Sequence, residues 1–202
     1  MGRVSDARDR LIKAVGELIW TGSYGTTTVE QICGRAGVMK GSFYHFFESK
    51  AALAEAALEA GWEDYRPNLD GVFSPTFPPL ERIRRYCAFE LNYQAQMRME
   101  HGRVLGCPYC TLGTEISTRE DRLRKRVDAY MDQERRYFES AIRDAQAEGR
   151  VRSANAAAMA KAVYAYVEGL LSLARIKNNL DVLKEMESGI LAILGVEAAS
   201  AA

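Results

Sequence analysis

The sequence predicts an all-α protein. Apolar residues recur three and four positions apart through most of the 202 residues, which is the spacing that covers one face of an α-helix. Glycine, proline and asparagine separate these stretches, as expected for turns between helices. No segment combines apolar–polar alternation with β-branched runs, so we expect no β-strand. The chain is long enough for one large or two small domains with a real core.

Three helices are predicted at the N-terminal end. The first covers residues 5–20 and has an apolar stripe formed by Leu11, Ile12, Val15, Leu18 and Ile19. The second starts after Thr28, a residue that can cap it, and buries Val29, Ile32 and Cys33. Residues 36–38 then break the helix, because Gly37 can adopt a positive φ. A third helix over 39–47 follows at once, and this arrangement is typical of a helix-turn-helix.

The third predicted helix has two different faces. Its inward positions are aromatic: Phe43, Phe46 and Phe47. Its outward positions carry Met39, Lys40, Gly41, Ser42, Tyr44 and His45. Small, cationic and hydroxyl side chains at the start of such a helix suit the major groove of DNA, where bulky groups would block approach. Ser49 can cap the next helix, which we expect to begin at Lys50.

The stretch from Thr28 to Leu53 reads T-V-x-x-I-C-x-x-A-G-V-x-K-G-S-F-Y-H-F-F-x-S-K-x-x-L. It resembles the signature of the tetracycline-repressor (TetR) family of bacterial transcriptional regulators, and Met39 departs from the small polar residue usual there. The resemblance implies that phosphates are held by Tyr44, His45 and Lys50. It also implies that base edges are faced by Met39, Lys40, Gly41 and Ser42. The backbone amides at the helix start of Thr28 also suit a phosphate, because the helix dipole favours an anion there.

The rest of the chain is predicted to be helical with one interruption. A helix from Lys50 to about Tyr65 joins the helix-turn-helix to the remaining helices. Residues 67–79 contain four of the five prolines and are predicted to be a non-helical linker. Further helices are predicted over 80–101, 118–148, 153–177 and 181–194, and Pro108 suits the first turn of one more.

Charge and hydropathy limit the possible partners. Lys plus Arg and Asp plus Glu both number 27, and this neutrality argues mildly against a nucleic-acid partner. Residues 1–50 have a net charge of only +2, so the motif rather than the charge predicts DNA binding. No apolar run of about 18 residues exists, and the N-terminus has no signal-peptide pattern. We therefore expect no membrane association, a cytoplasmic location and four reduced cysteines.

The sequence Cys107-Pro108-Tyr109-Cys110 has several interpretations. Two cysteines at this spacing can be redox-active or can form half of a metal site, for which Cys87 and His101 are the nearest further ligands. The surrounding GCPYCTLGTEIS also resembles a segment, roughly G-C-P-x-x-N-L-A-x-E, in the ligand-binding domain of one regulator subgroup. There the first cysteine needs no redox role. A structural role, thiol sensing and metal binding thus stay open, with a structural role favoured and no metal site predicted.

Aromatic and soft side chains on the later helices are candidates for binding a small effector. In the family that the motif resembles, the corresponding helices enclose a cavity, and tyrosines offer a polar tip on an apolar wall. Helical core is the alternative for each of them. The candidates are Tyr86, Phe89, Tyr93, Met97, Cys107, Tyr109, Cys110, Tyr130 and Tyr137.

The last two predicted helices are too apolar for a single buried stripe. In residues 153–177 the apolar positions cover well over half of the circumference, so both sides need burial. By resemblance, these helices pair with those of a second copy in a four-helix bundle. A homodimer also suits a palindromic DNA site, because two recognition helices can then enter successive major grooves.

The sequence therefore predicts a homodimeric regulator, most simply a repressor released from double-stranded operator DNA by a small molecule. Residues 1–50 are assigned to DNA binding and residues 51–202 to effector binding and dimerisation. One alternative keeps the fold and makes Cys107 and Cys110 the redox-responsive element. Another is a small redox enzyme, but no catalytic Ser/His/Asp arrangement or phosphate loop is present, so we predict no catalytic residue, metal or cofactor.

Overall fold

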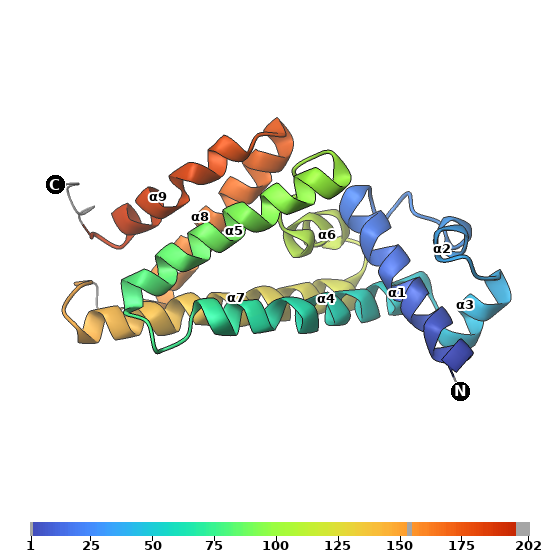
Figure 1. The fold of residues 1–202 in the computed structure, drawn as a ribbon. Coiled ribbons are helices and arrows are strands. Elements are labelled where there is room, and N and C mark those ends of the chain that lie inside the picture. Colours follow the sequence, from blue (N-terminus) through green and yellow to red (C-terminus); the bar gives the residue numbers. More distant parts are fainter. Residues whose placement is uncertain (1, 153–154, 197–202) are drawn as a thin grey trace. The chain divides into compact units, whose positions relative to one another are not determined.

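The computed structural model describes residues 2–152 and 155–196, and the regular structure within them is entirely helical, which confirms the predicted all-α class (Figure 1). The helices at the N-terminal end are α1 (Gly2–Thr21), α2 (Val29–Ala36), α3 (Lys40–Phe46) and α4 (Lys50–Val72). The later helices are α5 (Pro79–His101), α6 (Pro108–Ile116), α7 (Asp121–Ala147), α8 (Ala156–Lys177), the 3-10 helix η1 (Leu180–Glu185) and α9 (Met186–Ile193). None of the helices in this described part is long and apolar enough to span a membrane.

The chain forms two compact units. Unit 1 contains the residues up to Arg66 together with Pro108–Tyr130, and unit 2 contains Pro67–Cys107 together with the residues from Met131 onward. Unit 1 thus includes α6 and the start of α7, two segments that follow the helix-turn-helix only after a long interval of sequence. The predicted functional division at residue 50 does not coincide with this division into compact units, and it stays a prediction.

The turn between α2 and α3 has the predicted backbone. Gly37 adopts φ +63°, the left-handed conformation that ends α2. The Thr28 hydroxyl accepts from the Gln31 amide, while the Gln31 side chain accepts from the Thr28 amide, so a reciprocal capping box starts α2. Arg10 of α1 donates to the Ala36 and Gly37 carbonyls at 2.9 and 3.2 Å. The capping box therefore stabilises the start of α2, and the contacts of Arg10 hold its end against α1.

The prediction that residues 67–79 are non-helical is wrong for their first part. Helix α4 continues through Pro67 to Val72, and the division between the units falls at this proline. An internal proline removes one helical hydrogen bond and costs about 3 kcal/mol. Burial of Leu69, Val72 and Phe73 in unit 2 offsets that cost.

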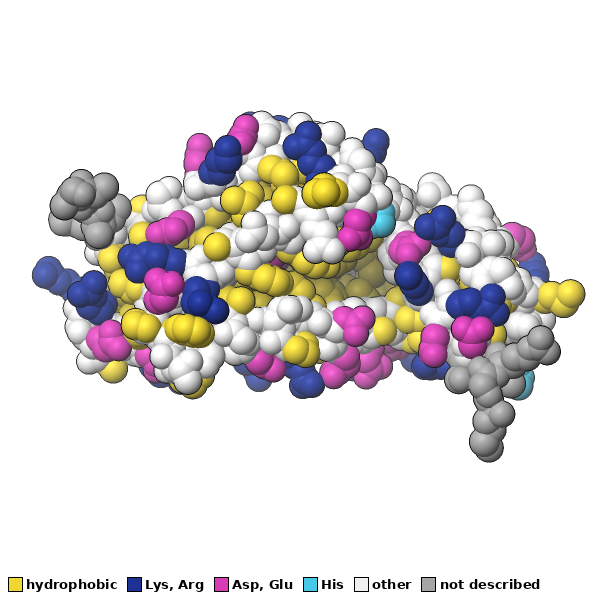
Figure 2. All heavy atoms as spheres, viewed as in Figure 1, with side chains coloured by type: hydrophobic (Ala, Val, Ile, Leu, Met, Phe, Trp, Pro, Cys, Tyr) yellow, Lys and Arg dark blue, Asp and Glu magenta, His cyan; other side chains and the backbone are white. Residues whose placement is uncertain are grey.

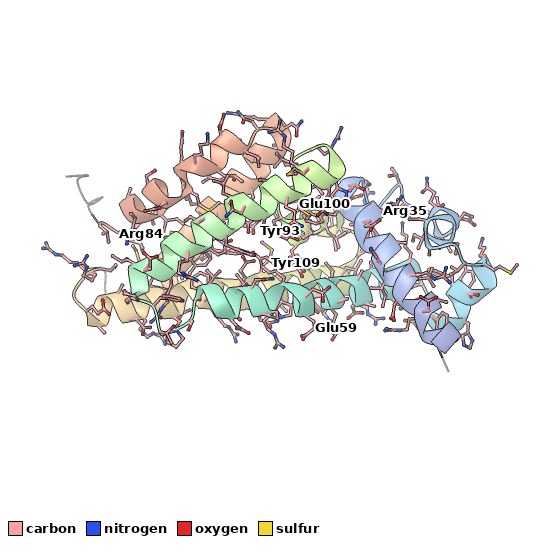
Figure 3. All side chains as sticks on the ribbon, viewed as in Figure 1. Arg35, Glu59, Arg84, Tyr93, Glu100 and Tyr109 are labelled. Carbon is pink, nitrogen blue, oxygen red and sulfur yellow. The ribbon has the colours of Figure 1, made fainter. Side chains whose placement is uncertain are left out.

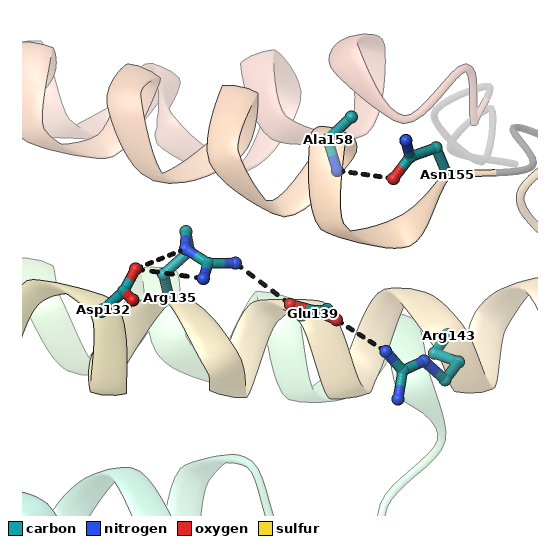
Figure 4. A network of polar contacts seen from close by, with 6 residues as sticks. All are labelled: Asp132, Arg135, Glu139, Arg143, Asn155 and Ala158. Carbon is teal, nitrogen blue, oxygen red and sulfur yellow. Dashed lines mark hydrogen bonds and ion pairs between the residues drawn. The ribbon is translucent and has the colours of Figure 1, made fainter.

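Other helix boundaries also differ from the prediction. The helix predicted over 118–148 begins at Asp121, after a turn that follows α6. The single helix predicted over 181–194 is instead η1 followed by α9. Helix α8 begins at Ala156, where the Asn155 side chain accepts from the Ala158 amide at 2.9 Å (Figure 4); its predicted first residue, Ser153, lies outside the described residues.

In unit 2, α8 packs on η1 and α9, and α5 packs on the same two elements (Figure 1). Helix α7 carries a ladder of ion pairs in which the half-buried Arg135 binds Asp132 and Glu139, and Glu139 also binds Arg143 (Figure 4). These pairs lie three and four residues apart, so they support a helix whose other side is buried. Its buried positions in this unit include Glu134, Phe138 and Ile142.

Candidate DNA-binding surface and effector site

Helix α3 is anchored to unit 1 by its aromatic side chains. Phe43 is fully buried and Phe47, the residue after the helix, is nearly so. Phe46, predicted to point inward as well, is only half-buried. The rings of Phe43 and Phe47 lie 6.3 Å apart, and Tyr44 packs edge-on against Phe43 at 5.1 Å. These contacts fix which side of α3 faces the solvent.

The exposed side of α3 contains the residues predicted to meet DNA. Met39, immediately before the helix, is 83% exposed and Tyr44 is 57% exposed. Lys40, Gly41 and His45 are also exposed, and Ser42 is half-buried. A Cβ atom at Gly41 would meet no atom within 4 Å, so this part of the surface is open to an approaching partner. The structure thus brings these predicted residues onto one accessible side, and their contacts with DNA stay predictions.

Lys40 has an intramolecular partner that the sequence analysis did not identify. Its ammonium group donates to the carboxylate of Glu30 on α2. The hydrogen bond with Lys40 lowers the pKa of Glu30, and the same hydrogen bond raises the pKa of Lys40. Because both side chains are solvent-exposed, this pair is a weak one that another anion can replace. Figure 2 shows basic and acidic side chains interspersed over α1–α3.

Lys50 and Thr28, also predicted to contact phosphate, make internal contacts. The Lys50 ammonium donates to the carbonyls of Tyr24 and Thr27 at 2.7 and 2.9 Å and lies 4.2 Å from the centre of the Tyr24 ring. The amide of Thr28 donates to Gln31 in the capping box. In this structure both groups hold the start of α2 in place, and their phosphate contacts stay predictions.

Two carboxylates outside the motif, those of Glu115 and Glu17, also position the helix-turn-helix. Glu115 of α6 accepts from the Ser23 hydroxyl and the Gly25 amide, each at 2.6 Å, and from the Tyr24 amide at 3.0 Å. Arg35 of α2, labelled in Figure 3, donates from Nε and Nη2 to the same oxygen, Oε2, of Glu17 of α1, at 3.1 and 2.8 Å. Burial alone would raise the pKa of Glu115, but hydrogen bonds from Ser23, Gly25 and Tyr24 lower it. Glu115 could not be found from the sequence, since nothing relates residue 115 to residue 24.

The effector candidates are divided between the two units. Tyr86, Phe89, Tyr93, Met97, Cys107 and Tyr137 belong to unit 2, whereas Tyr109, Cys110 and Tyr130 belong to unit 1. In unit 2, Tyr86 and Tyr137 both pack against Phe73, with centroid distances of 5.6 and 5.5 Å. The rings of Phe89 and Tyr93 stack at 6.0 Å (Figure 3 labels Tyr93). Their role in binding an effector stays a prediction.

The candidates of unit 1 form a second aromatic group. The Tyr109 ring lies 5.5 Å from that of Tyr130, which lies 5.7 Å from that of Trp62. The hydroxyl of Tyr109, a residue labelled in Figure 3, donates to the Leu58 carbonyl at 3.3 Å. Cys110 is half-buried, and Cys107 of unit 2 is buried. Neither is part of a disulfide, and no three His, Cys, Asp or Glu side chains among the described residues are placed to hold a metal ion.

Unit 2 buries a polar cluster that the sequence analysis missed. Glu134 of α7 accepts from the Tyr86 hydroxyl at 3.0 Å and from the Tyr164 hydroxyl at 3.3 Å. Burial, followed by the charges of Glu168 and Glu90, raises the pKa of Glu134 to about 8. Gln94 donates to Glu90 and accepts from the Gly106 amide at 2.9 Å.

A signal for this cluster was present in the sequence. Each of its acidic residues occupies a position that the helical spacing assigns to the apolar side of its helix. A buried carboxylate is costly unless it is bonded or protonated, so such positions deserve a functional or structural reason.

One exposed stripe of α8 is made of small and apolar residues, with the exposed Lys161 beside it. Leu173 and Ile176 in this stripe are 44% and 79% exposed, and its other members are alanine and glycine. The stripe consists of Ala158, Ala162, Ala165, Gly169, Leu173 and Ile176. Its three- and four-residue spacing lets another helix lie close along it.

Comparisons with known proteins agree with this geometry. A sequence model of the family "Bacterial regulatory proteins, tetR family" matches residues 11–57, and one for the "Tetracyclin repressor-like, C-terminal domain" matches residues 79–190. The transcriptional regulator AcuR of Cereibacter sphaeroides is 30% identical over 88% of this chain and 80% of its own. The transcriptional repressor NemR of Escherichia coli is 29% identical over 61% of this chain and 60% of its own.

Solved structures are similar over nearly the whole chain. A regulatory protein TetR from Rhodobacter sphaeroides has a TM-score of 0.80 and 29% identity, covering 91% of this chain and 96% of its own. The reduced form of E. coli NemR has a TM-score of 0.83 and 24% identity, covering 96% of this chain and all of its own, and this likeness concerns the fold. With the family models matching most of the chain and α3 presenting the expected side chains, the protein belongs to the tetR family of bacterial regulatory proteins and is a DNA-binding transcriptional regulator.

Proposed function

We propose that the protein is a homodimeric repressor that binds a palindromic operator through α3 and leaves it when a small molecule binds the later helices. The observation that carries this proposal is the exposed side of α3. It offers cationic, hydroxyl and small side chains to a partner while its phenylalanines fix the helix from behind. NemR, a relative over part of the chain, is named a repressor. Operator DNA of a bacterium lies in the cytoplasm, so we expect the protein to be located there.

Operator binding is tested with the full-length protein and the intergenic DNA beside its own gene. Lys40→Ala and Tyr44→Ala should each weaken binding, since either change removes a group that can bond a phosphate or a base. Affinity should also fall steeply with salt, as counterion release requires. Binding that is insensitive to both substitutions would exclude α3 as the contact surface.

Dimerisation is assigned to the last two helices because of the exposed stripe on α8. A side chain added at Gly169 would meet no atom of the same chain within 4 Å, so Gly169→Arg should leave the protomer folded. In a dimer that packs α8 against a second copy, the arginine would separate the helices. Gly71→Arg on α4 is the matched control, since its Cβ also meets open space. Sedimentation should report monomers for Gly169→Arg alone; dimers in both variants would refute this interface.

The small-molecule effector is proposed from the aromatic groups of the later helices. Its binding would release DNA if it favoured a protomer arrangement in which the recognition helices no longer match successive major grooves, about 34 Å apart. Tyr86→Phe and Tyr93→Phe are suitable variants, because they remove a hydroxyl and keep the ring. A candidate compound that lowers operator affinity equally in these variants and in the parent protein does not use those hydroxyls.

A thiol-responsive regulator is the second candidate. Cys107 and Cys110 are thiols outside any disulfide and three residues apart, one in the loop before α6 and one in its first turn. Diamide would take two electrons and two protons from them as a disulfide forms. Mass spectrometry of the oxidised protein, paired with operator binding, tests this function. A normal response to diamide in Cys107→Ser and Cys110→Ser variants would exclude it.

A further inference from the structure

Met39 has no evident role within the folded chain. Its side chain is 83% exposed, and its position is that of the cap residue of α3, where it makes no side-chain capping bond. Serine, threonine, aspartate or asparagine at this position would stabilise the helix by about 1 kcal/mol. The chain therefore has a methionine where both solvent exposure and helix capping favour a small polar residue.

The exposed apolar groups of unit 1 are concentrated at this place. Among its described residues, the large apolar side chains that are exposed are Met39 and Tyr44, both on the accessible side of α3. Tyr44 has a hydroxyl that can bond a phosphate and a ring that packs on Phe43. Met39 has a thioether, which is only a weak acceptor and cannot donate. A phosphate or a polar base edge is thus a poor partner for Met39, and an apolar group is a good one.

The residues beside Met39 leave room for such a partner. The space above Gly41 is open, and the Lys40 ammonium is held by Glu30 on α2. In the major groove of unmodified DNA, the apolar group displayed at the base edges is the C5-methyl group of thymine. An unbranched methionine can adapt its three side-chain torsions to cover a methyl group of this size.

We propose that Met39 is a specificity-determining residue that contacts the C5-methyl group of a thymine in each half of the operator. This inference rests on the proposed operator binding by α3. Burial of one methyl group contributes a factor of about four to affinity per half-site. Met39 therefore discriminates thymine from cytosine and uracil by packing rather than by a hydrogen bond.

The experiment begins with a randomised pool of palindromic duplexes, from which the full-length protein selects bound sequences. Each thymine of the selected half-site is then replaced by deoxyuridine, which removes the methyl group and leaves base pairing intact. Affinities are measured for the parent protein, for Met39→Ala and for Met99→Ala. Met99 is 88% exposed on α5 of unit 2 and controls for the loss of an exposed methionine away from α3.

The expected result is one thymine per half-site at which deoxyuridine weakens binding about fourfold in the parent protein and in Met99→Ala. In Met39→Ala the same replacement should have no effect, because the methyl group has then already lost its partner. An equal deoxyuridine effect in the parent and in Met39→Ala would overturn the role of Met39. Tight binding to a selected sequence with no sensitive thymine would do the same, and both outcomes would leave the proposed operator binding intact. A pool without any enriched sequence would overturn the proposed operator binding, and this inference with it.

Discussion

The carboxylate of Glu115 accepts a hydrogen bond from the backbone amide of Tyr24 at 3.0 Å. The same carboxylate accepts from the neighbouring Gly25 amide, and Lys50 donates to the Tyr24 carbonyl. The loop that leads into α2 is therefore held by α6 on one side and by the start of α4 on the other. A displacement of α6 within unit 1 would act directly on the first helix of the helix-turn-helix.

Replacing Glu115 by alanine should loosen this loop. The change removes three acceptor contacts, and loss of bonds to partly buried donors costs about 1–3 kcal/mol. Hydrogen exchange at the amides of Tyr24 and Gly25 should become faster, and operator affinity should fall. Glu115→Gln, which keeps one acceptor oxygen, should show a smaller effect. Unchanged exchange at both amides in Glu115→Ala would contradict the assigned contacts.

The Glu115 contacts should also depend on pH. Its pKa is lowered in the folded state, so its contribution to stability is present above the ordinary pKa of a glutamate. That contribution is lost as the pH falls through the lowered value. Unfolding by urea between pH 7 and pH 3 should show a smaller loss of stability in Glu115→Gln than in the parent protein.

Alanine at Gly37 and at Gly41 should have opposite effects. Gly37 has φ +63°, and its Cβ would lie 3.4 Å from Arg10 Nη1, so Gly37→Ala should destabilise unit 1 by about 1 kcal/mol. Gly41 lies within α3 and faces open space, so Gly41→Ala should preserve stability and weaken operator binding by adding a methyl group to the contact surface. Thermal unfolding and operator titration separate the two effects. Equal stability of both variants would contradict the strain assigned to Gly37.

Glu30→Gln should strengthen DNA binding. The substitution releases Lys40 from its ion pair and removes a carboxylate that would repel phosphates. Affinity for non-specific DNA should rise, and the slope of log affinity against log salt should steepen by about one. Glu48→Gln, which also removes one exposed negative charge of unit 1, is the control for net charge. Identical salt slopes for the two variants would show that the loss of Glu30 gives Lys40 no additional contact with a DNA phosphate.

Glu134→Gln should change how the stability of unit 2 responds to pH. The pKa of Glu134 is raised to about 8, so its neutral form stabilises the fold. This contribution is present below the ordinary glutamate pKa and declines as the pH rises towards about 8. The variant stays neutral and should be the more stable protein at pH 9, with little difference at pH 4. Glu139→Gln, which removes an ion-paired carboxylate of the same helix, should not produce this gain.

The sequence predicted the fold class and the helix-turn-helix because both depend on local signals. Gly37 marks the turn, Thr28 the cap and Phe43 the inward side of α3, and each acts within a few residues of its own position. The exposed side of α3 follows from these local choices, since exposed positions on a short helix are determined once its buried positions are known. The correct part of the prediction is thus the part governed by helix periodicity and turn chemistry.

The errors concern interactions between distant residues. The rule that proline breaks helices failed at Pro67, because burial of Leu69 and Val72 outweighs the lost hydrogen bond. The contact between Glu115 and Tyr24 joins residues 91 positions apart. The carboxylates of Glu90 and Glu134 come from different helices, so the effect of Glu90 on the pKa of Glu134 requires the fold. The acidic residues themselves were visible on apolar helix sides, but their shared environment was not.

The composition of unit 1 has a consequence for protein engineering. Unit 1 is assembled from two segments, the residues up to Arg66 and Pro108–Tyr130. No single cut in the chain therefore isolates the helix-turn-helix together with all the segments that pack against it in this unit. A chimera that transplants only the N-terminal segment onto a different sensor would leave the α1–α2 loop facing a foreign α6. A chimera of two relatives should therefore acquire the new operator specificity when the transplanted region includes the residue corresponding to Glu115. A chimera without that residue should fold poorly.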